Sequence, residues 1–404
     1  MNDEQGTAVP MANTVQGELV ESQSRSLFAR LSLLDRLLTP LIFLSMVVGV
    51  LIGVFVKNVQ HAFDTVQFHS VSVPIAVGLI IMMIPILTKV RYESLSHTFL
   101  SRKLWIHLSF SLVLNWIVGP FVMLALAWAT LPDLPTYRTG VIMVGIARCI
   151  AMVMIWNGLA GGDAEYCAIL VAVNSVLQIV LYSPFAVLFV DILGGATSGG
   201  QVHLQYGEVA ISVLIYLGIP LLAGIVIRLT LLRLSPHFFH HTFIPIFSPV
   251  ALIGLLYTIL VMFAYQGHHI VTNITKVLRV IVPLVLYFVI MWTGAMALLW
   301  TLARKEVCKP SRGKVFNYET TVVQAFTAAS NNFELAIAVT IATYGVGSDQ
   351  ALAASIGPLV EVPVLLALTW LAQAIRVRLD WGISECNSRC LESGSACVED
   401  KERA

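Results

Sequence analysis

Long apolar runs, each close to the length that crosses a lipid bilayer, constrain this sequence more than any other feature. A membrane-spanning helix needs about 20 residues, and only internally hydrogen-bonded helices or closed barrels span the hydrocarbon core. Only 12% of the 404 residues are charged and 57% are hydrophobic, whereas an average soluble domain is about 25% charged. The sequence therefore predicts an all-α polytopic membrane protein. Its ten apolar runs cover about 37–56, 71–89, 104–129, 139–160, 165–191, 208–230, 244–265, 277–303, 319–344 and 351–375.

The basic residues between the runs indicate the orientation. With a cytoplasmic N-terminus, nineteen of the 24 Lys and Arg residues fall in cytoplasmic segments and four fall outside, which leaves Arg148 alone inside a run. Cytoplasmic loops of membrane proteins carry such an excess of Lys and Arg. We therefore expect ten transmembrane helices with both termini in the cytoplasm. A net charge of +1 gives no reason to expect a nucleic-acid partner.

A glycine-rich stretch at residues 194–200 divides the runs into two sets of five. Because five is odd, the two sets would insert with opposite orientations, an arrangement found in secondary transporters. The polar break in run four then matches the asparagine pair in run nine, and Gln178 in run five matches Glu361 in run ten. The expected parts are a cytoplasmic arm at 1–36, a first five-helix repeat at 37–193, an extracytoplasmic connector at 194–207, a second five-helix repeat at 208–376 and a cytoplasmic tail at 377–404.

The fourth run contains an arginine next to a cysteine, Arg148-Cys149. A charge at the bilayer centre costs about 2.5 to 17 kcal/mol, so it needs a partner, a hydrated cavity or a function. A nearby cation favours the thiolate, which is nucleophilic and suits a thiophilic solute. A lone cysteine in an apolar helix is more often a small hydrophobic residue, which is what we expect for Cys167.

Two carboxylates in the second half are the expected proton carriers. Glu334 follows Asn331 and Asn332, and consecutive asparagines disfavour a continuous helix. Glu361 lies between two prolines in the tenth run, and an intramembrane carboxylate is a functional residue by default. Arg148 either forms an ion pair with Glu334 or contacts the substrate, and both interpretations stay open.

Other residues complete the candidate site. Asn332, Asn174 and Trp156 are further candidate substrate contacts, although a polar residue such as Asn174 also serves to join helices. Arg228 is expected to extend to the cytoplasmic surface. The spacing of the six cysteines fits no zinc or disulfide framework, and no nucleotide loop or catalytic triad is present, so we expect no metal, no cofactor and no enzyme activity. The tail cysteines have no assigned role: Cys386, Cys390 and Cys397.

At these motifs the chain resembles the Acr3 family of arsenite efflux transporters, of the fungal type, within the bile-acid/arsenite/riboflavin transporter superfamily. The resemblance implies ten helices with discontinuous, crossing helices 4 and 9. It also implies proton-coupled export of arsenite, and of antimonite, across the plasma membrane, with the vacuolar membrane as the other location. The family's essential cysteine corresponds to Cys149 and its span-nine carboxylate to Glu334. The matching segments are 145–163 (GIARCIAMVMIWNGLAGGD), 331–339 (NNFELAIAV) and 357–365 (GPLVEVPVL).

Two other functions remain as alternatives. A sodium-coupled organic-anion symporter on the same scaffold would have no use for a thiol beside an arginine, and arsenite uptake without sodium separates it from an exporter. A non-transporting metalloid receptor would need a large soluble signalling domain, which neither terminal segment is long enough to form. The oligomeric state does not follow from the sequence.

Overall fold

The computed structural model describes residues 38–56, 59, 67–68, 71–90, 92, 102–150, 152–195, 204–305, 315–379 and 381. Within these residues every regular element is a helix except a short hairpin of β1 (Gln67–Phe68) and β2 (Val71–Ser72). The all-helical prediction is therefore confirmed for this part of the chain. The predicted arm at 1–36, most of the connector and tail, and Cys308, Cys386, Cys390 and Cys397 lie outside the described residues.

The helices coincide with the apolar runs. The helices of the first half are α3 (Leu38–Phe55), α5 (Val73–Thr88), α7 (Arg102–Leu112), η1 (Val113–Val118), α8 (Gly119–Thr130), α9 (Pro135–Ile146), α10 (Met152–Ala160), α11 (Ala164–Ala186) and η2 (Val187–Ile192). The helices of the second half are α12 (Tyr206–Val213), η4 (Leu214–Gly218), α13 (Ile219–Leu234), α14 (Pro236–Phe238), η5 (Phe239–Phe243), α15 (Ile244–Thr272), α16 (Ile274–Lys305), α17 (Tyr318–Ala329), α18 (Phe333–Tyr344), α19 (Asp349–Ser355) and α20 (Gly357–Arg378).

Among the described residues, six continuous helical segments are long and apolar enough to cross a membrane. The shorter apolar helices are α3, α5 and α18. Runs four and nine are each divided into two short helices. The chain is thus a polytopic helical protein, and the count of ten spans stays a prediction. The six segments are 102–130, 164–192, 206–234, 236–272, 274–305 and 349–378.

Several long helices contain a π-helical segment just before a proline. η1 precedes Pro120, η4 precedes Pro220 and η5 precedes Pro245. A proline ring lacks an N–H and collides with the carbonyl group four residues earlier. A wider turn relieves that collision while the helix continues, so each segment stays long enough to cross the bilayer.

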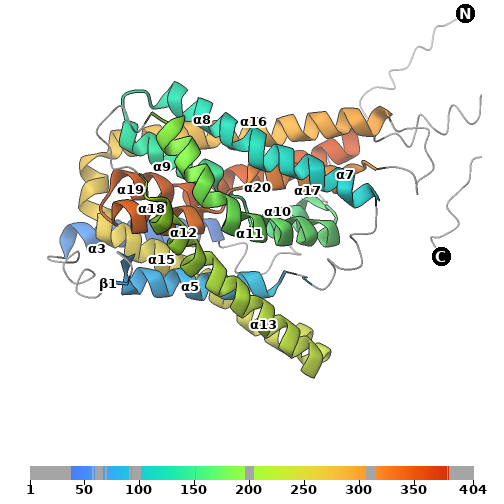
Figure 1. Ribbon diagram of the computed structural model, residues 1–404, viewed down its shortest axis with the longest axis horizontal. Coiled ribbons are helices and arrows are strands. Elements are labelled where there is room, and N and C mark those ends of the chain that lie inside the picture. The colour runs from blue at the N-terminus through green and yellow to red at the C-terminus, as the bar shows by residue number, and fades with distance from the viewer. Residues whose placement is uncertain are drawn as a thin grey trace, which may run out of the picture.

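The helices form two groups that pack against each other. α15 packs along α3 and α5, and these three helices are called the lower group because they lie along the lower part of Figure 1. The second group includes α8, α9 and α16 to α20, with α16 against α17 and α9 against α19. Glycines bring α3 and α15 together, because a Cβ atom at Gly53 would lie 2.9 Å from the Cα of Gly267. Close approach at small residues is a common way for membrane helices to pack.

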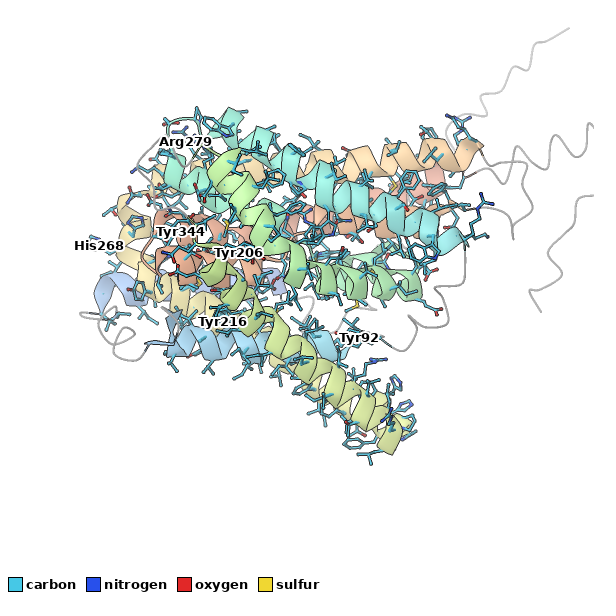
Figure 2. All side chains as sticks on the ribbon, in the orientation of Figure 1. Tyr92, Tyr206, Tyr216, His268, Arg279 and Tyr344 are labelled. Atoms are coloured by element: carbon cyan, nitrogen blue, oxygen red, sulfur yellow. The ribbon has the colours of Figure 1, made fainter. Side chains whose placement is uncertain are left out.

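An exposed ion pair joins the first turns of α16 to the connection between α8 and α9. Arg279 Nη1 lies 2.7 Å from Asp133 Oδ2, and Arg279 Nη2 lies 2.5 Å from Asp133 Oδ1. Hydrogen bonds from this guanidinium lower the pKa of Asp133 from 3.8 to about 2. Figure 2 shows Arg279 and His268 at the same end of the molecule.

Candidate functional site

Both predicted helix breaks are present, and they meet. α9 ends at Ile146 and α10 begins at Met152, whereas α17 ends at Ala329 and α18 begins at Phe333. Beyond the ends of α9 and α17, Ala147 and Ser330 have extended backbone angles, and Arg148 forms an isolated antiparallel bridge with Asn331. Two broken helices from opposite halves of the sequence therefore cross at one buried point, which we call the crossover.

The two asparagines satisfy the helix ends exposed by the breaks. Asn331 Nδ2 donates to the carbonyl oxygens of Val144 and Ala147 at 2.9 and 3.1 Å, and the backbone N–H of Asn332 also donates to Ala147 at 3.1 Å. Asn332 Oδ1 accepts a hydrogen bond from the backbone N–H of Leu335 at 3.1 Å, so it caps α18. Helix ends leave unpaired backbone groups, and these cannot be left unpaired in hydrocarbon. This explains why the sequence needs two side-chain amides here.

Gln178 holds the first break in place. Its Nε2 donates to the carbonyl oxygen of Arg148 at 2.6 Å, and its Oε1 accepts from the backbone N–H of Arg148 at 3.1 Å. Gln178 follows Arg148 by 30 residues, and Glu361 follows Asn331 by the same interval. The sequence alone gave Gln178 no role at the site, although this equal spacing was visible in it.

Of the two interpretations of Arg148, the ion pair with Glu334 is not formed. The Arg148 side chain is fully buried, and its guanidinium donates to Tyr287 Oη at 2.9 Å and to the carbonyl oxygen of Gly145. Among the described residues it makes no ion pair with a carboxylate. The last turn of α9 carries partial negative charge, which stabilises a cation there. Gly119 leaves the space, because a Cβ atom at that position would lie 2.6 Å from Arg148 Nη1.

Cys149 is buried close to two acidic residues. It is 1% exposed, and the backbone N–H of Val153 faces its sulfur. The thiol interacts electrostatically with Glu361 and Glu334 and with the Cys167 thiol, whereas the Arg148 guanidinium is hydrogen-bonded to Tyr287 and Gly145. A thiol and two carboxyl groups are thus gathered at the crossover.

A cavity of about 230 Å³ lies between the lower group and the crossover. Glu334 is the acidic group in its wall, and the methionines of α5 and α10 add three thioethers to an otherwise mostly apolar surface. The cavity can therefore admit a small neutral solute to a carboxylate close to the thiol. The lining residues are Met82, Ile86, Lys89, Met152, Met154, Ile155, Ser248, Ala251, Leu252, Leu255 and Glu334.

The remaining predicted contacts do not line this cavity. Asn174 Oδ1 accepts a hydrogen bond from Trp116 Nε1 at 3.2 Å, so this asparagine does join two helices. Trp156 is 2% exposed, and its Nε1 has no partner among the described residues. Glu361 is also buried, with Oε1 unpartnered in the described part of the chain and the backbone N–H of Asn331 facing its carboxyl group.

Arg228 does not extend to the surface as expected. It is 3% exposed and donates to the carbonyl oxygens of Thr88 and Lys89 at 3.1 and 3.3 Å, where α5 ends. α13 continues to Leu234, so Arg228 lies within the helix rather than at its end, and its side chain is covered by neighbouring residues. It instead caps α5, the helix that carries part of the cavity wall.

Comparison with known proteins identifies the family. The chain is 41% identical to the arsenical-resistance protein Acr3 of Corynebacterium glutamicum, over 86% of this chain and 91% of that protein. It is 29% identical to the arsenical-resistance protein Acr3 of Alkaliphilus metalliredigens, over 85% of this chain and 93% of that protein. It is 31% identical to an uncharacterized transporter of Synechocystis sp., over 84% of this chain and 88% of that protein. The sequence model of the Sodium Bile acid symporter family matches residues 76–273. This chain is therefore a multi-pass membrane transporter of the Acr3 arsenical-resistance family.

Proposed function

We propose that this protein exports trivalent arsenic in the form of arsenite from the cytosol in exchange for protons, and that it exports antimonite in the same way. The observation that carries the proposal is the crossover, where Cys149 and two carboxyl groups lie together beside a 230 Å³ cavity. The relatives named as arsenical-resistance proteins support the same substrate. We also propose ten membrane spans in two inverted repeats, which the equal spacing of Arg148–Gln178 and Asn331–Glu361 supports.

The thiol suits the substrate chemistry. Arsenite near neutral pH is uncharged As(OH)₃, and soft thiol ligands bind such a metalloid well. In the proposed step the Cys149 sulfur forms a bond to arsenic, one As–O bond breaks, and the departing hydroxide leaves with the thiol proton as water. One sulfur ligand holds arsenic transiently, whereas three would trap it.

Four buried donors support further contacts with the arsenic hydroxyl groups. Among the described residues, the unpartnered atoms include Arg148 Nε, Trp156 Nε1, Asn174 Nδ2 and Asn332 Nδ2. An unpaired buried donor costs about 1–3 kcal/mol, so such groups gain when a ligand supplies an acceptor. We retain these four residues as substrate contacts on that ground.

Proton exchange supplies the driving force that a neutral substrate lacks. A membrane potential of about 100 mV contributes roughly 2.3 kcal/mol for each inward positive charge, and each pH unit adds about 1.4 kcal/mol. In the proposed cycle, ionised Glu334 faces the cavity when arsenic enters from the cytosol. The second group of helices then moves against the lower group, and protons from outside neutralise Glu334 and release the metalloid.

Charge placement supports the proposed orientation. Basic residues gather at the end of the bundle where α7 begins and α16 and α20 end, among them Arg102, Arg304 and Arg378. Cytoplasmic segments are enriched in such residues. We propose that this end is cytoplasmic, that both termini lie inside, and that the protein resides in a fungal plasma membrane or, as the second possibility, a vacuolar membrane.

Transport in proteoliposomes tests this function. With an imposed pH gradient and no sodium, the wild-type protein should accumulate arsenite, and dissipating the gradient should stop the accumulation. Glu334→Gln should abolish the response to the pH gradient. Uptake that requires sodium and ignores the pH gradient would instead establish the organic-anion symporter type of coupling.

A further inference from the structure

The bridge at the crossover directs four backbone groups away from its centre. The hydrogen bond from the Asn332 N–H to the Ala147 carbonyl flanks the pair of Arg148 and Asn331. In an antiparallel pair flanked in this way, the two facing residues do not bond each other. The N–H and C=O groups of Arg148 therefore point to one side, and those of Asn331 point to the other.

Each side meets one residue 30 positions later in the sequence. On the first side Gln178 bonds both backbone groups of Arg148, the carbonyl at 2.6 Å and the N–H at 3.1 Å. On the second side the N–H of Asn331 faces the carboxyl group of Glu361. Within the described residues no donor reaches the Asn331 carbonyl, and Glu361 Oε1 is buried without a partner.

The two sides differ in the side chain that meets the backbone, an amide at Gln178 and a carboxyl group at Glu361, and the carboxyl group can donate a hydrogen bond only when it is protonated. A side-chain amide offers both donors and an acceptor, whereas an ionised carboxylate offers acceptors alone. A protonated carboxyl group regains a donor and so matches the amide. We propose that protonated Glu361 forms hydrogen bonds with both the N–H and the C=O of Asn331, as Gln178 does with those of Arg148. We call each such pair of hydrogen bonds a latch. The Gln178 latch is permanent, whereas the Glu361 latch opens when Glu361 loses its proton.

The groups around Glu361 favour this arrangement. The charged and titratable groups that face it are Glu334 and Cys149. The helices packed against α20 include α3 and α10, which contain no charged residue, and α16, α17 and α19. The charged residues of α16 lie near its two ends, at Lys276, Arg279, Arg304 and Lys305. The charges of α17 and α19 also lie at the helix ends, where Glu319 pairs with Arg376 and Asp349 with His269. Two neighbouring carboxyl groups do not readily carry charge at the same time, so one of them can keep a proton to donate.

Through this latch, the protonation of Glu361 would control the position of the backbone segment that carries Asn331 and Asn332. When Glu361 is ionised, its oxygens and the Asn331 carbonyl are acceptors that face each other, so the extended segment between α17 and α18 loses its support. That segment also carries Asn332, which caps α18 just before Glu334. Gln178 is then a positioning residue with no exchangeable charge. The coupling to transport rests on the proposed function, whereas the latch itself does not.

Infrared spectroscopy of the full-length protein in lipid nanodiscs tests the latch, because a carboxylic acid and a carboxylate have distinct carbonyl bands. At neutral pH the wild-type protein should show a buried acid band that Glu361→Gln removes and Glu334→Gln keeps. Gln178→Glu should add a second such band. A spectrum that Glu361→Gln leaves unchanged would overturn the proposal.

Thermal melting against pH gives an independent readout. Glu361→Gln should fold and melt near the wild-type temperature at low pH, and it should lack the decrease of about 2 °C that the wild type shows as Glu361 ionises. Glu361→Leu, which fills similar space without hydrogen bonds, should melt lower than Glu361→Gln at low pH. Failure of Glu361→Gln to fold, or equal melting of the two variants, contradicts the latch. Neither measurement needs arsenite, so both remain valid if the wild type transports none.

Discussion

Tyr287→Phe removes one oxygen atom from the interior and tests what holds Arg148. Tyr287 Oη accepts from Arg148 Nη1 at 2.9 Å and donates to the carbonyl oxygen of Ala328 at 3.2 Å. A hydrogen bond to a charged group contributes about 1.5–3 kcal/mol, and a neutral one contributes about 1 kcal/mol. We therefore expect the variant to lose about 2–4 kcal/mol of unfolding free energy without any change in packing volume.

Melting of the purified protein in detergent measures this loss. For a chain of 404 residues, an unfolding entropy of about 2.1 cal/mol/K per residue makes 1 kcal/mol correspond to about 1.2 °C, so we expect a decrease of roughly 2–5 °C. Tyr216→Phe is the matched control, because the Tyr216 hydroxyl is buried and has no partner among the described residues (Figure 2). Because an unpaired buried hydroxyl group is itself destabilising, this control should melt at the wild-type temperature or above it.

Glu334→Gln completes this test. The structure gives Glu334 no part in holding the guanidinium, so the variant should melt near the wild-type temperature. If Tyr287→Phe melts with the wild type while Glu334→Gln melts several degrees lower, Arg148 depends on Glu334 after all, and our description of its surroundings is wrong.

Three further substitutions have definite expectations. Gly357→Ala places a Cβ atom against the buried ring of Phe333, and overpacking of this kind costs about 1–3 kcal/mol, measured as a lower melting temperature. Asn331→Leu removes two amide hydrogen bonds and should cost about 2 kcal/mol in the same assay. Arg279 lowers the pKa of Asp133 from 3.8 to about 2, so the stability from this exposed pair is present above pH 3.8 and is lost as the pH falls towards 2. The small difference in melting temperature between Asp133→Asn and the wild type should disappear over that range.

The sequence predicts the helices well because lipid leaves few choices. Each apolar run can satisfy its backbone only as a helix, and the boundaries observed for α3, α5 and α16 lie within a few residues of those expected. The breaks were also predictable, since Asn331 and Asn332 compete with the helix for backbone hydrogen bonds.

The partners of the buried cations were not predictable in the same way. Arg148 lies in an extended segment, so helical periodicity gives no direction for its side chain, and its partner Tyr287 looks like an ordinary packing residue in an apolar run. The prediction that Arg228 extends to the surface is wrong because its helix continues to Leu234, beyond the end of the apolar run at 208–230. The latch residue Gln178 becomes recognisable only when the two 30-residue intervals are compared across the bridge.

The most direct test of the central claim compares the two buried thiols of the described residues in arsenite transport. Cys149 lies at the crossover beside Glu334 and Glu361, whereas Cys167 lines a second cavity of about 170 Å³ that shares Lys89 and Met154 with the first. In proteoliposomes with an imposed pH gradient, Cys149→Ser should abolish arsenite uptake, and Cys167→Ser should retain it. Uptake that survives Cys149→Ser at the wild-type rate would contradict the account.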